Sequence, residues 1–242
     1  MSRKKADAAW GAWNDQTWDD LRTQEGMGMV LLPLCPANHQ DHYPDCESPG
    51  KTPAKLGVAG RTYHRTNWTG EVAAGERLDL ATFRKVQDDR RRNGYGPMNI
   101  GVATGLPMED GRVLVGVDPD GPEGLATIKG VLGADHPPTL TYKTGNGWRA
   151  LYGCSPDRVA PNANDDGGHN GLAVQSTGRQ VVIAPSWHHD RQVPYQRVGR
   201  LILPADLPES VYQWAFAPGP GEGGAGGPAA QRPRPAGGCC AV

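Results

Sequence analysis

The 242-residue chain lacks the features that would place it in a membrane or outside the cell. It has no run of about 18 apolar residues, so it offers no membrane-spanning helix. Its basic start, Met1-Ser-Arg-Lys-Lys, leads into a polar, tryptophan-rich segment and not into the apolar core of a signal peptide. Its five cysteines are odd in number and scattered, which argues against a disulfide framework. These absences predict a cytoplasmic protein with no membrane partner.

The chain also lacks an excess of charge of either sign, because its formal net charge is −1. Any contact with nucleic acid must therefore come from a local basic patch. No G-x-S-x-G motif is present, which argues against the nucleophile elbow of an α/β-hydrolase.

Glycine and proline are abundant, with 34 and 22 residues, and they predict many turns. They concentrate near the end, where we expect a disordered tail over residues 217–242. Residues 1–216 are long enough for one large domain. A polar, turn-rich segment at residues 35–75 is expected to be an insertion in that domain.

Hydrophobic periodicity predicts an α+β fold with a mixed or antiparallel sheet flanked by helices, because strand patterns dominate after residue 95. Helices are expected at residues 6–22, from an N-cap at Asp79 to residue 92, at 122–132 and at 206–216. Strands are expected at 29–34, 99–105 and 113–118, as a hairpin at 139–143 and 148–152, and as a second pair at 172–176 and 180–184.

Two carboxylates end the apolar stretch that begins at Val113, because Asp118 and Asp120 are separated by a single proline. In a strand, residues at this spacing point to the same side. Hard cations such as Mg²⁺ and Mn²⁺ prefer oxygen ligands, and two such ions can hold the attacking and leaving oxygens of a phosphoryl transfer. The same Asp-Pro-Asp-Gly letters also suit a surface turn, which is the commoner explanation on spacing alone.

Two cysteines and two histidines lie close together in the polar segment: Cys35, His39, His42 and Cys46. Two thiolates and two imidazoles satisfy tetrahedral Zn²⁺, and a metal would order a segment that is too polar to fold by burial. Because all four side chains would be ligands, we expect such a site to be structural and not catalytic. The alternative is a polar loop that binds no metal.

A glycine-rich turn and a Pro-Ser-x-His sequence supply further candidates. Thr144-Gly-Asn-Gly147 lies between Lys143 and Arg149, and backbone N–H groups in such turns bind phosphate with help from nearby cations. Ser186 and His188 end an apolar stretch, where they suit contacts with a triphosphate or a sugar. Most such turns are simply hairpins, and a serine at a strand end more often caps a loop.

In this order, the pieces resemble the N-terminal domain of the bifunctional DNA primase/polymerases (prim-pol), within the archaeo-eukaryotic primase superfamily. The resemblance covers roughly residues 27–215. It rests on the following segments: Met29–Leu34 as the opening strand, the loop from Cys35 to Cys46, Ser48-Pro-Gly-Lys-Thr-Pro53, Asn99-Ile-Gly-Val-Ala-Thr-Gly105, Val117-Asp-Pro-Asp-Gly-Pro-Glu-Gly124, Thr144-Gly-Asn-Gly-Trp148, and Ala184-Pro-Ser-Trp-His188 followed by Tyr195.

The resemblance implies template-directed nucleotidyl transfer from nucleoside triphosphates, in the replication of a phage, plasmid or other mobile element. It implies that Asp118 and Asp120 hold Mg²⁺ or Mn²⁺ in a two-metal mechanism. Single-stranded or primer-template DNA would be the second partner. A replicative helicase is expected as a separate protein, because no G-x-x-x-x-G-K-[ST] occurs. The expected nucleotide contacts are Lys143, Gly145, Gly147, Arg149, Arg179, Ser186 and His188.

Two positions depart from the family pattern. Arg149 stands where the family usually has a histidine, and it cannot act as a neutral donor or base. Ala173, or Gln175 in a neighbouring register, stands where a third acidic residue is usual. Acidic residues of nearby loops are candidates to replace it: Asp157, Asp165 and Asp166. Three functions stay open: an active primase/polymerase, a weak or inactive relative that binds nucleotide or primer-template DNA, and a small zinc-binding interaction domain.

Overall fold

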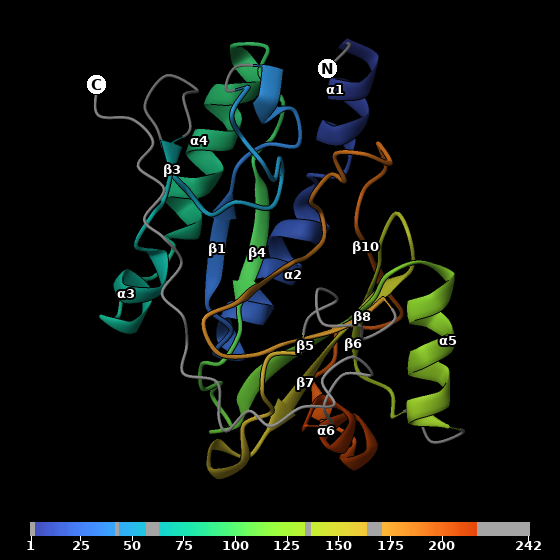
Figure 1. The fold of residues 1–242 in the computed structure, drawn as a ribbon. Helices are drawn as coiled ribbons and strands as arrows, with labels where there is room; N and C mark the ends of the chain where they lie inside the picture. Colours follow the sequence, from blue (N-terminus) through green and yellow to red (C-terminus); the bar gives the residue numbers. More distant parts are fainter. Residues whose placement is uncertain (1–2, 42–43, 57–62, 134–136, 164–170, 217–242) are drawn as a thin grey trace.

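The computed structural model describes residues 3–41, 44–56, 63–133, 137–163 and 171–216. Within them the chain is an α+β protein in which two mainly antiparallel sheets meet, with helices packed against both sheets (Figure 1). This confirms the expected fold class. The tail expected at residues 217–242 lies outside the described residues. No described helix combines the length and the apolar character that a membrane span requires.

The larger sheet carries the Asp118 strand in its interior. Its strand order is β10-β6-β7-β5-β8, and each pair along this path is antiparallel. A short strand, β11, joins β7 in parallel, so the sheet is mixed. The strands are β5 (Val113–Pro119), β6 (Leu140–Lys143), β7 (Trp148–Cys154), β8 (Leu172–Gln175), β10 (Gln196–Val198) and β11 (Ala205–Asp206).

β5 is buried on both of its faces, which explains its continuous apolar run. Val115 and Val117 pack in a cluster with α5 (Gly121–Leu132) and α6 (Glu209–Phe216). Leu114 points the other way, into the cluster beneath the smaller sheet. Asp118 follows Leu114 in this alternation, so it faces the smaller sheet and not the two helices.

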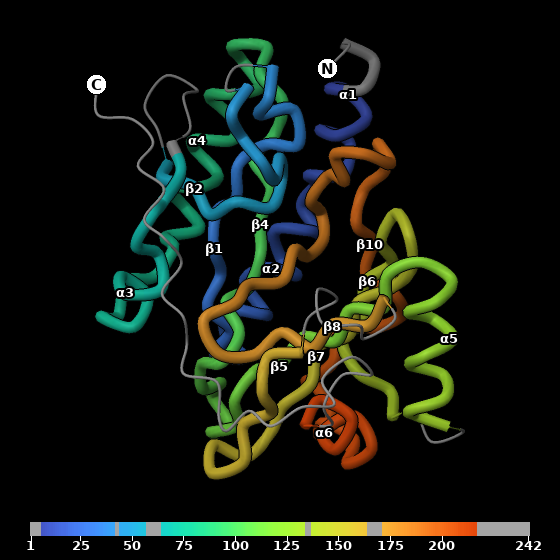
Figure 2. The backbone as a smooth tube through the Cα atoms, viewed as in Figure 1, coloured from blue at the N-terminus to red at the C-terminus, as the bar shows by residue number. Residues whose placement is uncertain are grey.

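The smaller sheet has the order β1-β4-β9, with β1 and β4 running side by side (Figure 2). Its strands are β1 (Leu31–Leu34), β4 (Asn99–Ala103) and β9 (Gln180–Val182). It approaches the larger sheet closely next to Asp118, because a Cβ atom at Gly116 would lie 2.4 Å from Cγ2 of Val181. Gly116 therefore permits the contact that brings the two sheets together.

Two helices pack in the core around the smaller sheet. α2 (Asp15–Gly26) and α4 (Leu80–Arg92) contribute Trp18, Leu21 and Phe83 to the cluster that also contains Ile100 of β4. The start of α4 is as expected, because the Asp79 side chain accepts a hydrogen bond from the Ala81 N–H.

Two expected elements were wrong. The single helix at residues 6–22 is two helices, α1 (Arg3–Gly11) and α2, because Asn14 and Thr17 form a capping box that starts a new helix. The strands expected to pair at 172–176 and 180–184 do not pair with each other. β8 joins β5 and β9 joins β4, so the turn at Gly178, where φ is +68°, passes the chain from one sheet to the other.

The polar insertion has little regular structure. It contains a single turn of 3₁₀ helix at His39–Asp41, the two-stranded sheet of β2 (Ala54–Lys55) and β3 (Tyr63–His64), and α3 (Trp68–Ala73). The β2–β3 pair places His64 beside Ala54, and a bridge between Leu34 and Pro53 holds this part of the insertion next to β1.

Candidate functional site

Asp118 lies in a row of residues that crosses the larger sheet. On one side it is in register with Ala173 of β8, and Gln175 is in register with Gly116. On the other side its carboxylate forms an ion pair with the guanidinium of Arg149 on β7. The position beside Asp118 on β8 therefore carries no carboxylate, and the position on β7 carries a cation.

Arg149 is buried and held from several sides. Its Nη1 donates a hydrogen bond to the Val182 carbonyl at 3.1 Å, and its guanidinium lies 5.7 Å from the ring centroid of Tyr195. Burial alone would lower the pKa of Arg149, but the Asp118 carboxylate outweighs it, so the pKa is raised and the side chain stays charged. Its Nε–H has no hydrogen-bond partner among the described residues.

Asp120 differs from Asp118, because it is exposed and lies in no ion pair within the described part of the chain. Its backbone forms a bridge with Gly147, which brings the strand end against the glycine turn. An open cavity of about 520 Å³ lies here, a volume within the range of small-molecule sites. Glu123, Asn146 and Arg191 line it together with Asp120, so it combines two carboxylates, an amide and a cation.

The glycine turn is shaped by close packing. A Cβ atom at Gly145 would lie 2.4 Å from Cγ of Arg191, and one at Gly147 would lie 2.7 Å from the Pro119 carbonyl oxygen. The Thr144 hydroxyl accepts the Gly147 N–H at 3.0 Å. The Gly147 N–H is therefore already hydrogen-bonded and is not available to a phosphate. The turn shapes the site through its close packing.

His188 and Tyr195 form the wall next to Arg149. Their rings are stacked, with centroids 5.6 Å apart and planes 14° apart. Burial lowers the pKa of His188, and the positive charge of Lys51 lowers it further. His188 is therefore neutral at pH 7. The shift also places Lys51, Arg149 and Asp120 within electrostatic reach of this ring.

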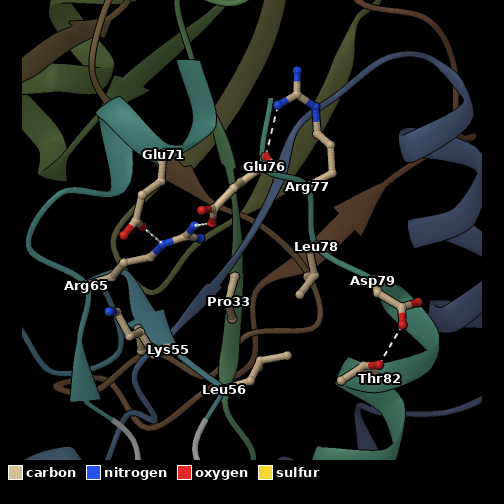
Figure 3. A pocket seen from close by; sticks show the side chains of 11 residues that line it. Pro33, Lys55, Leu56, Arg65, Glu71, Glu76, Arg77, Leu78, Asp79 and Thr82 are labelled. Atoms are coloured by element: carbon tan, nitrogen blue, oxygen red, sulfur yellow. Dashed lines mark hydrogen bonds and ion pairs between the residues drawn. The ribbon is translucent and has the colours of Figure 1, made fainter. Parts of the chain in front are cut away.

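A second cavity, of about 490 Å³, is lined by Lys51 and Arg179 together with Gln175, which lies on the same face of β8 as Ala173. Arg65 also lines it, but its guanidinium forms ion pairs with Glu71 and Glu76 (Figure 3). Those carboxylates already compensate its charge. Lys51 and Arg179 are in no ion pair within the described residues, so they are the cations this cavity offers to an anion.

Two predicted nucleotide contacts lie elsewhere. Ser186 is fully buried, and its hydroxyl accepts the Ile100 N–H and donates to the Ile100 carbonyl, both at 2.8 Å. It ties its loop to β4 and has no donor left for a ligand. Lys143 is exposed and follows Tyr142, which is in register with Arg149, so Lys143 points to the opposite face of the sheet from Arg149. We therefore omit both from the proposed nucleotide contacts.

The insertion gathers a separate cluster of four side chains: Cys35, His39, Cys46 and His64. Their ligand atoms all lie within 4.8 Å of one another, and Nε2 of His64 lies 3.2 Å from Nδ1 of His39. Two nitrogens bound to one tetrahedral Zn²⁺ would be about 3.3 Å apart. His42, which we predicted as the fourth ligand, lies outside the described residues.

The two thiols of this cluster are hydrogen-bonded to each other. The hydrogen bond from Cys35, together with those from His39 and His64, lowers the pKa of Cys46 to about 4. The same contact raises the pKa of Cys35. The Gly50 N–H donates to the Cys35 sulfur at 3.2 Å. Two cysteines, which bind the metal as thiolates, and two imidazoles are the donor set of a Cys₂His₂ zinc site, so the residues fit this metal.

Comparison with known families places these sites in context. The family of N-terminal domains of bifunctional DNA primase/polymerases matches residues 21–210, from within α2 to within α6. The chain belongs to this prim-pol family. No curated protein matches it. The prim-pol assignment covers both sheets, so the Asp118 row, the glycine turn and the Cys/His insertion are all parts of one family domain.

Three residues of these prim-pol sites were missed in the sequence. Lys51 lies in the Pro-Gly-Lys-Thr-Pro segment that supports the resemblance. Its place in that segment could therefore have identified it as a site residue. Arg191 lies three residues after His188, in a loop with no pattern of its own. His64 lies far from the other zinc ligands in the sequence, and only the β2–β3 pairing brings it to them.

Proposed function

We propose that this prim-pol domain, residues 1–216, binds a nucleoside triphosphate and primer-template DNA and catalyses DNA primase/polymerase-type nucleotidyl transfer. The process we propose is the replication of a phage, plasmid or other mobile element. The observation that carries the proposal is the bridge between Asp120 and Gly147, which joins the carboxylate strand to the glycine turn at the mouth of a cavity that contains Arg191.

The side chains around this site suit a triphosphate. Arg191 and Asn146 would donate hydrogen bonds to phosphate oxygens, and Lys51 and Arg179 would attract the remaining negative charge from the neighbouring cavity. His188, which is neutral and stacked on Tyr195, would form the apolar wall that orients the nucleotide.

Asp120 fits a single Mg²⁺ or Mn²⁺ ion, because such ions commonly bind one or two carboxylates together with substrate phosphates. When bound, the ion would neutralise phosphate charge and polarise the reacting oxygens. Asp120 and Glu123 are the described carboxylates that line this cavity, which suits one ion, since Asp118 is paired with Arg149 and Ala173 supplies no ligand. Asp165 and Asp166, two of the predicted replacements for the third carboxylate, lie outside the described residues.

The test is a primer-extension and de novo priming assay with Mn²⁺ and Mg²⁺, comparing wild-type protein with Asp120→Asn. We choose Asp120 because it is exposed and unpaired, so its replacement leaves the fold unchanged. Asp88→Asn, at an exposed carboxylate of α4 that lines neither cavity and is in no ion pair among the described residues, is the matched control. Loss of product in Asp120→Asn alone supports the proposal, whereas equal product from all three proteins contradicts it.

A second candidate is a catalytically weak relative that binds nucleotide or primer-template DNA without extending it efficiently. The ion pair between Arg149 and Asp118 favours it, because the carboxylate is engaged before any metal arrives. Tight nucleotide binding without extension by the wild-type protein would select this candidate. Robust primer synthesis would exclude it.

For the insertion we propose a structural Zn²⁺ bound by Cys35, His39, Cys46 and His64. The metal would join the first part of the insertion, which supplies three ligands, to β3, which supplies His64. A zinc-binding interaction domain without polymerase chemistry is the least supported function, because the family match extends over both sheets and not only over the insertion.

A further inference from the structure

The ion pair between Arg149 and Asp118 is a built feature of the sheet. Both residues lie on the face that the smaller sheet covers, with side chains 8% and 16% exposed. The Val182 carbonyl and the Tyr195 ring fix the guanidinium from the side of the smaller sheet. A cation held in this way cannot move aside as an exposed lysine would.

The residues on either side of Asp118 also leave it without the ligands that a second metal ion needs. A divalent ion at Asp118 would need further carboxylate ligands, and β8 presents Ala173 at the register position beside it. The β7 position presents a charge of the same sign as the ion. The set of Asp118, Asp120, Glu123 and Arg149 carries a charge of −2, which one divalent ion neutralises.

Arg149 also keeps a free donor. Its Nε–H is buried and has no partner among the described residues, although buried N–H groups are nearly always bonded. An anionic oxygen at this point would satisfy it. The guanidinium can therefore do what a metal ion does for a triphosphate, because it supplies a fixed positive charge beside Asp118.

We propose that Arg149 takes the place of one of the two catalytic metal ions, so that this prim-pol site binds its nucleotide with a single Mg²⁺ or Mn²⁺ at Asp120. The inference rests on the proposed function, since it assigns the cations of the same nucleotide site. It makes Arg149 a nucleotide-binding residue and Asp118 the carboxylate that positions it.

The test is electron paramagnetic resonance of the full chain titrated with Mn²⁺, first without nucleotide and then with dATP. Two Mn²⁺ ions in a shared site lie about 3.5–4 Å apart and give an exchange-coupled spectrum, whereas one ion gives a mononuclear spectrum. We expect a mononuclear spectrum from the wild-type protein in both conditions. An exchange-coupled spectrum from the wild-type protein overturns the inference.

A variant that restores the metal ligands gives the second arm. Arg149→His combined with Ala173→Asp frees Asp118 and places a carboxylate beside it, so Mn²⁺ should bind roughly tenfold tighter or more and give the coupled spectrum. Arg200→His, at an exposed arginine that lines neither cavity, is the matched control and should keep one weak site. Unchanged Mn²⁺ binding in the folded double variant overturns the inference.

The two proposals fail in different ways. The Mn²⁺ spectra of the wild-type protein, compared with those of the Arg149→His/Ala173→Asp variant, test whether Arg149 replaces an ion, whether or not dATP binds. Absence of dATP binding to the folded wild-type protein, measured by isothermal titration calorimetry, would contradict the proposed function. It would not change the number of Mn²⁺ ions that the spectra show.

Discussion

Replacing Asp118 with asparagine tests the Arg149 ion pair through the sign of its effect on stability. In an open site where carboxylates repel each other, removing one negative charge stabilises the fold. In this protein the change leaves a buried guanidinium without its counter-charge. Breaking such a pair from one side costs about 3–5 kcal/mol, because the remaining charge is desolvated and uncompensated.

The expected magnitude follows from the burial of the two side chains. Arg149 is 8% exposed and Asp118 is 16% exposed, so water screens the pair poorly. For a chain of this size each kcal/mol shifts the melting temperature by about 2–4 °C, so Asp118→Asn should melt about 6–20 °C below wild type. Asp120→Asn, at an exposed and unpaired carboxylate, should stay within about 0.5 kcal/mol of wild type.

The assay is urea unfolding of wild type and both variants in the presence of a chelator, followed by circular dichroism. Adding Arg149→Gln to Asp118→Asn completes a double-mutant cycle, and the double variant should lose less stability than the sum of the single variants. If Asp118→Asn were as stable as wild type, or more stable, the ion pair would not be an internal counter-charge. The inference of a single metal ion would then fall with it.

Three further outcomes are expected. Removing Zn²⁺ with a chelator should lower the melting temperature of wild type, and His64→Ala should lose this response while His42→Ala keeps it; the reverse would favour the ligand set predicted from the sequence. Because the pKa of His188 is lowered on folding, the unfolded chain binds more protons below about pH 6.5, so stability should fall as the pH drops through that value, and His188→Gln should show a smaller fall in urea unfolding. Lys51→Ala should weaken dATP binding in calorimetry by roughly tenfold at low salt, and an effect no larger than that of Lys143→Ala would remove Lys51 from the site.

Local signals predicted most of the elements correctly. The N-cap at Asp79 fixes the start of α4, and the apolar run from Val113 predicts a strand because a strand covered on both faces needs apolar residues throughout. The helix predicted at 6–22 failed, because periodicity continues across Asn14 although the backbone does not. The pairing of 172–176 with 180–184 failed because proximity in sequence favours a hairpin, and only the packing of two sheets shows that the strands belong to different ones.

The sequence determined the family, the carboxylate pair and the two departures from the family pattern, because each is a property of residue type at a spacing. It could not determine what the departures do. Only the tertiary structure places Arg149 and Ala173 on either side of Asp118, brings Lys51 to the wall of a cavity, and carries His64 to the cysteines. These contacts join residues distant in the chain, and such contacts depend on sheet register and on packing between sheets, which no local pattern records.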